Sequence, residues 1–216
     1  MFADDTTSLF TAETQAELFK KSNNAVIHAL KWFQSSQLFL NPIKTNVVQF
    51  TPTKVPTVLN IQYAGLTFPQ VEVIRFLGLQ LDKQITWRSH LYFLLNKLSK
   101  ACFVLGRLCY VLDIDALKLV YFANFQSVVK YDIVFWGNSY NLNKVFLLQK
   151  RIHRIMLGLS YRSSFKFWFK KLDILTVPCL YIFSLAMFVI NNPSYFQTNM
   201  SLHGIDTRQK NKLHKP

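Results

Sequence analysis

Residues 88–112 read RSHLYFLLNKLSKACFVLGRLCYVL, and this stretch decides how the second half of the chain folds. Apolar residues recur in it every three or four positions, which is the spacing of one face of an α-helix. They are Leu91, Leu94, Leu95, Leu98, Cys102, Leu105, Cys109 and Leu112. Lys97, Lys100 and Arg107 fall outside this stripe. The stretch therefore predicts a long amphipathic helix that buries one face against other helices.

Three further helices are expected after this one. The first covers about 115–136 with Asp113 or Asp115 as its N-cap, the second covers 141–157, and the third covers about 174–191. Short connections join these segments, and short connections are typical of a packed antiparallel bundle.

The most apolar stretch of the chain is 174–190, which contains Pro178 and Ser184. It is slightly too short for a membrane-spanning helix and has a proline near its start. We therefore expect a buried helix, so that no membrane is involved. A helix anchored in a membrane is the alternative.

The first part of the chain has a mixed pattern. The opening MFADDTTSLF indicates a tight hairpin, and a helix should follow with Thr11 as N-cap and Glu13 in its first turn, up to about Ser36. Four short strands are then expected, over 47–51, 58–63, 72–75 and 76–81. These patterns predict an α+β chain with three parts, namely 1–84, a helical region 85–191 and a basic surface tail 192–216.

The composition limits the class of protein. With 25 Lys and Arg against 11 Asp and Glu, the chain has a net charge of +14, so we expect an anionic partner, either nucleic acid or a membrane surface. A chain that is 50% hydrophobic with 20 Phe is not a disordered one. Its three cysteines favour a reducing, intracellular compartment over a disulfide scaffold, and no cysteine pair has zinc spacing.

The basic residues concentrate in one run without acid. Between Ile133 and Leu172 there is no Asp or Glu. The run contains eight basic residues, namely Lys144, Lys150, Arg151, Arg154, Arg162, Lys166, Lys170 and Lys171. Such a run is either a solvated face or a surface that binds the phosphate backbone of a duplex.

Asp4 and Asp5 are the strongest candidates for chemistry. Two adjacent carboxylates at a hairpin tip repel each other unless a cation lies between them, and Mg²⁺ binds through one or two carboxylates plus substrate phosphates. The alternative is a solvated turn, in which Asp is common.

Several motifs extend this pattern in a fixed order. Phe2-Ala3-Asp4-Asp5 comes first, and Asn41-x-x-Lys44-Thr45 and Phe76-Leu77-Gly78-x-x-Leu81-Asp82 follow. Downstream lie Trp87-x-x-His90, Tyr131 with Trp136-Gly137, Leu148-Gln149-Lys150-Arg151-x-x-Arg154, and Thr207-Arg208. In this order they resemble the reverse transcriptases of non-LTR, LINE-like retrotransposons, especially the jockey type. Asp132 departs from the pattern, because that family usually has Gly there.

The resemblance implies a fold and a set of roles. Residues 1–84 would be the C-terminal part of a polymerase palm and 85–191 a helical thumb. Asp4 and Asp5 would bind the Mg²⁺ or Mn²⁺ ions of an RNA-directed DNA polymerase, with Lys44 near the leaving pyrophosphate. Phe76, Leu77 and Gly78 would be the primer grip, and the thumb would hold the duplex by its phosphates.

The implied partners are an RNA template, a DNA primer and deoxynucleoside triphosphates. The family also needs a third carboxylate and the fingers, which would precede Asp4. We therefore expect a polymerase fragment that is inactive alone. The alternative is a non-catalytic, degenerate retroelement product that binds nucleic acid through its basic helices.

Overall fold

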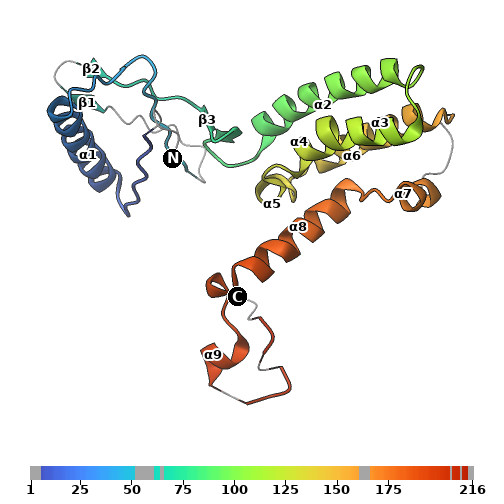
Figure 1. Ribbon diagram of the computed structural model, residues 1–216. Helices are drawn as coiled ribbons and strands as arrows, with labels where there is room; N and C mark the ends of the chain where they lie inside the picture. The colour runs from blue at the N-terminus through green and yellow to red at the C-terminus, as the bar shows by residue number, and fades with distance from the viewer. Residues whose placement is uncertain are drawn as a thin grey trace. The chain divides into compact units, whose positions relative to one another are not determined.

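The computed structural model describes residues 6–51, 61–63, 66–160, 166–204, 206–209 and 211–213 (Figure 1). For Gln62, Tyr63, Leu66 and Lys166 it describes the backbone alone. The chain forms two compact units, Met1–Thr86 and Trp87–Pro216. The first combines a helix with short strands and the second is helical, so the chain is α+β as expected.

The first unit contains one helix and two small antiparallel pairs. Its elements are α1 (Gln15–Ser35), β1 (Gln62–Tyr63), β2 (Leu66–Thr67), β3 (Val73–Phe76) and β4 (Leu79–Asp82). Strand β1 pairs with β2, β3 pairs with β4, and α1 lies against β1. The apolar side chains buried in this unit include Leu30, Ile61, Phe68 and Leu79.

The helix α1 begins later than predicted. Its N-cap is Thr14 and not Thr11, because the Thr14 hydroxyl accepts a hydrogen bond from the backbone N–H of Glu17 at 3.3 Å. Glu17 rather than Glu13 then lies in the first turn and pairs with Lys21 at 2.7 Å. In the predicted hairpin, 1–5 lie outside the described residues, and 6–10 form no strand.

The predicted strand 47–51 is wrong. Val47 forms a single parallel bridge to Gln70, in which its N–H donates to the Pro69 carbonyl at 3.0 Å. The N–H of Thr51 donates to the Lys83 carbonyl at 3.0 Å, so the segment does not continue as a ladder beyond this bridge. Of the predicted strand 58–63, only Gln62–Tyr63 is a strand among the residues described.

The next two predicted strands form a hairpin whose turn was misplaced. The turn lies at Leu77-Gly78, between the paired residues Phe76 and Leu79, and not between residues 75 and 76. Leu77 and Gly78 have φ of 46° and 87°. Positive φ at both central residues is the mark of a type I′ turn, which matches the twist of the two strands.

The second unit is a helical bundle followed by the C-terminal segment (Figure 1). Its elements are α2 (Arg88–Leu108), α3 (Ile114–Tyr121), the π-helix η1 (Phe122–Gln126), α4 (Ser127–Lys130), α5 (Ile133–Trp136), α6 (Leu142–Leu157), α7 (Lys166–Leu172), α8 (Val177–Asn191), the short 3₁₀-helix η2 (Pro193–Tyr195) and α9 (Asn199–His203). Helix α2 packs against α6, α3, η1 and α4, and α8 packs against α4, α5 and α6. The predicted stripe of α2 is buried at Leu91, Leu94, Leu98, Cys102 and Leu105.

The predicted continuous helix 115–136 is interrupted. It begins at Asp113, whose carboxylate accepts from the N–H of Ala116 at 2.9 Å, so Asp113 and not Asp115 is the cap. After η1 and α4 the chain turns at Asp132, which has a φ of 51°. The carbonyls at the end of a helix have no partner within the helix. Here the Trp136 indole donates to the Tyr131 carbonyl at 3.1 Å and supplies that partner.

The predicted buried helix 174–190 is buried only at its start. Val177 and Leu180 are buried, whereas most later apolar side chains of α8 are exposed. These are Ile182, Phe183, Leu185, Met187, Phe188 and Ile190. Among the described residues, no helix has the length and apolar character to cross a membrane. Helix α7 was not predicted.

His153 of α6 is buried among aromatic rings. Its centroid lies 4.6 Å from that of Phe169 and 5.1 Å from that of Tyr121, and its Nε2 has no hydrogen-bond partner among the described residues. Burial lowers the pKa of His153 from 6.5 to about 4, because it penalises the charged form.

This burial predicts an acid-sensitive fold. Between about pH 6.5 and pH 4 the unfolded chain binds a proton at His153 that the folded chain does not, so stability falls as the pH falls through this window. The loss at the acid end is about 3 kcal/mol. Denaturant unfolding at several pH values should show that the free energy of unfolding of His153→Phe depends less on pH than that of the unchanged chain. His28→Gln, which changes an exposed histidine, should keep the original profile, and an unchanged profile for His153→Phe would contradict the account.

Candidate nucleic-acid interface

The two carboxylates of the predicted metal site, Asp4 and Asp5, lie outside the described residues. Within the part of the chain that the structure describes, no group of three His, Cys, Asp or Glu side chains could hold a metal ion. The expected Mg²⁺ or Mn²⁺ site therefore stays a prediction.

Lys44 lies in an exposed turn that Asn41 organises. The Asn41 side-chain oxygen accepts from the N–H groups of Ile43 at 3.1 Å and Lys44 at 3.2 Å. The hydroxyl of Thr45 donates to the Asn41 carbonyl at 2.8 Å. Asn41 and Thr45 thus fold the turn, and the Lys44 side chain remains exposed to solvent.

The predicted primer grip forms the tip of the β3–β4 hairpin. Phe76 is 37% exposed and Leu77 is 50% exposed, so two apolar side chains face solvent at the tip. A leucine at φ 46° costs about 1 kcal/mol, because its Cβ crowds the backbone in the left-handed region. This tip is apolar, strained and accessible, which suits a contact with another molecule.

Replacing Leu77 with Asn should stabilise the hairpin. Asn-Gly is the preferred pair for a type I′ turn, so Leu77→Asn should gain about 1 kcal/mol. Backbone amides of β3 and β4 should then exchange hydrogen about fivefold more slowly. Leu77→Ala is the control, since it removes the apolar side chain without favouring positive φ. Unchanged or faster exchange in Leu77→Asn would show that the turn is not strained.

The helix α6 separates its apolar and basic residues. Val145, Ile152 and Met156 are buried in the bundle. The four predicted phosphate-binding residues of this helix, Lys144, Lys150, Arg151 and Arg154, are exposed or half-buried. The ammonium group of Lys150 lies 4.2 Å from the centroid of the Phe146 ring, which is a cation–π contact.

The helix α7 adds two further basic residues beside α6. Its Phe169 packs on His153 of α6, with ring centroids 4.6 Å apart. Lys170 and Lys171, both exposed, follow Phe169 directly. Arg162 lies outside the described residues, and for Lys166 only the backbone is described. The described part of the predicted basic run thus gathers on α6 and α7.

The buried side chain of Gln149 ties α6 to its neighbours. Its amide nitrogen donates to the Tyr121 hydroxyl and to the Leu175 carbonyl, each at 2.8 Å. Its oxygen accepts from the N–H of Val177 at 2.9 Å. This one side chain joins α3, α6 and the start of α8, so Gln149 of the Leu-Gln-Lys motif builds the fold while its neighbours carry charge.

Two other motifs have packing roles as well. A Cβ on Gly137 would overlap the Tyr181 ring of α8 and the Ile133 carbonyl, so glycine is required where α5 and α8 approach. The ring of His90 lies 5.7 Å from that of Trp136, centroid to centroid. Burial lowers the pKa of His90, and the charge of Asp132 acts against this. The positive φ of Asp132 explains why glycine would suit that position.

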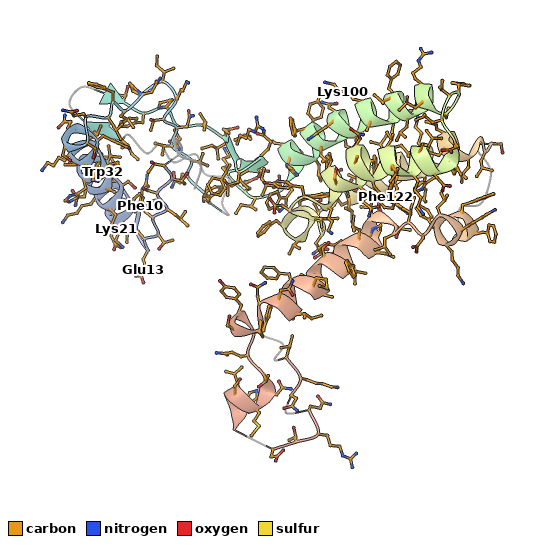
Figure 2. The ribbon with its side chains drawn as sticks, in the orientation of Figure 1. Phe10, Glu13, Lys21, Trp32, Lys100 and Phe122 are labelled. Carbon is orange, nitrogen blue, oxygen red and sulfur yellow. The ribbon has the colours of Figure 1, made fainter. Side chains whose placement is uncertain are left out.

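Helix α2 also carries positive charge, which was not predicted as part of the basic surface. This helix carries Arg88, Lys97, Lys100 and Arg107 and no acidic residue, and Lys100 is exposed on it (Figure 2). Its partner α6 also has four basic residues and no acidic one. The sequence does indicate the basic character of α2, because no Asp or Glu occurs between Asp82 and Asp113.

A comparison with known proteins finds a partial similarity to a transposon polymerase. The chain is 25% identical over 170 residues to a Drosophila melanogaster protein described as "Probable RNA-directed DNA polymerase from transposon BS". The match covers 74% of this chain and 18% of that protein, so the chain spans less than a fifth of its length. No family model and no solved structure matches the chain. This partial similarity supports a relationship to the RNA-directed DNA polymerases of transposons at that broad level.

Proposed function

We propose that this chain is the C-terminal part of the polymerase domain of a non-LTR, jockey-type retrotransposon reverse transcriptase, comprising the end of the palm and the thumb. The first unit would be the palm part and the bundle of the second unit the thumb. The relationship to a transposon polymerase and the order of the motifs support this proposal.

The observation that carries the function is the basic surface of α6 and α7. It has basic side chains on the outside, a buried apolar face that fixes the helix, and no acidic residue over the whole run from 134 to 172. A surface rich in basic side chains attracts a phosphate backbone without reading its sequence. In our proposal it holds the duplex of RNA template and DNA primer.

In the intact parent polymerase, Asp4 and Asp5 would hold Mg²⁺, which would supply charge stabilisation for nucleotide transfer. Lys44 would offer a positive charge or a proton near the departing pyrophosphate, since its side chain is exposed on an ordered turn. The hairpin tip at Phe76, Leu77 and Gly78 would contact the primer strand, where the backbone of Gly78 permits close approach.

Binding of an RNA–DNA duplex to the full chain should depend steeply on salt. Each phosphate contact contributes about −0.7 to −0.9 to the slope of log affinity against log salt concentration. The double variant Lys144→Gln, Lys170→Gln should therefore make the slope shallower by about 1.5 units. Fluorescence anisotropy of a labelled duplex at several salt concentrations measures this slope.

The matched control is Lys20→Gln, Lys31→Gln, which removes the same charge from exposed positions of α1. It should leave the slope close to that of the unchanged chain. A slope near zero for the unchanged chain would contradict nucleic-acid binding, and equal effects of the two double variants would contradict the assignment to α6 and α7.

A primer-extension assay tests the proposal that this is a fragment of the catalytic unit. The chain alone should incorporate no nucleotide on a primed RNA template with Mg²⁺ or Mn²⁺, because the proposed palm also needs a carboxylate from an earlier strand. Incorporation that disappears in Asp4→Ala would contradict this and would make the chain a complete polymerase.

A further inference from the structure

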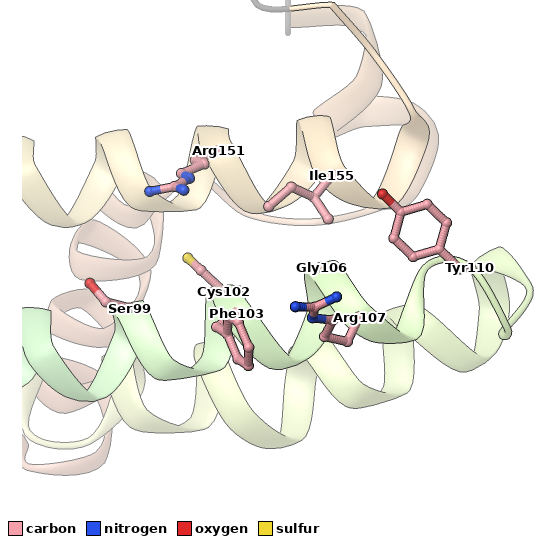
Figure 3. Close-up of a pocket in the computed structure, with 8 residues that line it drawn as sticks. All are labelled: Ser99, Cys102, Phe103, Gly106, Arg107, Tyr110, Arg151 and Ile155. Carbon is pink, nitrogen blue, oxygen red and sulfur yellow. The ribbon is translucent and has the colours of Figure 1, made fainter.

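A groove of about 310 Å³ runs between α2 and α6 (Figure 3). The side of α2 and of the turn that follows it contributes Phe103, Gly106, Arg107 and Tyr110. Helix α6 contributes Arg151 and Ile155, one helical turn apart. The α2 residues are spaced at i, i+3, i+4 and i+7, so they form one continuous wall of the groove.

The groove has two arginines on opposite walls. Neither Arg107 nor Arg151 forms an ion pair with a carboxylate in the described part of the chain, and none of the residues that line the groove is acidic. Figure 3 shows Arg151 on α6 and Arg107 on α2. Guanidinium groups bind phosphate oxygens through paired hydrogen bonds, so each of the two suits a backbone phosphate.

The thiol of Cys102 does not neutralise this charge. Burial raises the pKa of Cys102 to about 11, although the positive charge of Arg151 acts to lower it. The thiol is therefore uncharged near neutral pH, and the groove keeps the positive charge of its arginines.

The α2 wall of the groove exposes aromatic rings. Tyr110 is 85% exposed and Phe103 is 65% exposed, and the guanidinium carbon of Arg107 lies 5.3 Å from the centroid of the Phe103 ring. Exposed aromatic rings beside a positive groove stack on the bases of single strands. In a duplex the base faces are covered by neighbouring base pairs, so these rings favour an unpaired strand.

Gly106 keeps the groove open between the two arginines. A Cβ added there would lie 3.9 Å from the nearest atom of Ile155, which is ordinary contact distance. Alanine would thus fit without a clash, and a longer side chain would project into the groove. Glycine in a helix interior lowers the stability of the helix relative to alanine. Gly106 therefore leaves the groove open at the expense of helix stability.

We infer that the groove between α2 and α6 binds single-stranded nucleic acid, with backbone phosphates at Arg107 and Arg151 and a base stacked on Tyr110. The inference rests on the proposed nucleic-acid binding function and adds a second site for an unpaired strand. The duplex surface of α6 and α7 is a separate part of the bundle, although Arg151 borders both.

Fluorescence anisotropy of the full chain, measured separately with two labelled probes, distinguishes the two sites. The probes are a fluorescein-labelled oligothymidylate and a labelled blunt-ended RNA–DNA duplex. Tyr110→Ala should weaken oligothymidylate binding about tenfold, the expected effect of losing one stacked base, and should change duplex binding less than about twofold. Tyr140→Ala is the control, because Tyr140 is 95% exposed and does not line the groove.

Arg107→Gln tests the phosphate contact and should weaken oligothymidylate binding by a similar factor. Lys130→Gln, which removes an exposed charge from α4, should not. Gly106→Leu should reduce oligothymidylate binding about tenfold by filling the groove, and Gly106→Ala should raise the thermal midpoint. If a groove variant loses oligothymidylate binding but keeps the thermal midpoint of the unchanged chain, unfolding does not explain the loss.

The outcomes distinguish the inference from the proposed function. If the unchanged chain binds neither probe, both fail. If it binds both probes and the groove variants change neither, the proposed function stands and the groove is not a binding site. If Tyr110→Ala weakens both probes equally, the groove contacts the duplex, and the inference of a single-strand site is wrong.

Discussion

The second unit depends on the buried amide of Gln149. Its three hydrogen bonds, to the Tyr121 hydroxyl, the Leu175 carbonyl and the Val177 N–H, satisfy both ends of the side chain away from water. They hold α3, α6 and the start of α8 in one register. Because Gln149 fixes the inner face of α6, the charged neighbours Lys150 and Arg151 are directed outward. A buried polar group satisfied in this way specifies one arrangement of the helices.

Several residues of the sequence motifs build the structure rather than carry charge. Asn41 orders the turn that presents Lys44, Gly137 permits the contact of α5 with α8, and His90 packs against Trp136. Some residues proposed to contact nucleic acid lie in the same motifs, as Lys44 does beside Asn41. The same short motif can therefore contain residues that fold the chain and residues proposed to bind.

The amphipathic helices were predictable because burial of one face imposes a helical period, as in α2 and α6. The break at Asp132 was not, since it depends on the Trp136 indole reaching the Tyr131 carbonyl. The basic face of α6 was visible as a charge run. The groove was not, because Arg107 and Arg151 are 44 positions apart and meet only when α2 packs on α6. The prediction of a strand at 47–51 was wrong because β-propensity does not indicate whether a neighbouring strand is present to pair with.

We propose that the basic helices α2, α6 and α7 contact nucleic acid directly. The most direct test is photo-crosslinking of the full chain to a 4-thiouridine-containing RNA annealed to a shorter DNA primer, followed by mass spectrometry of the crosslinked peptides. The account predicts crosslinks within residues 99–110 and 144–171. Crosslinks confined to the exposed apolar surface of α8, or spread evenly over both units, would contradict it.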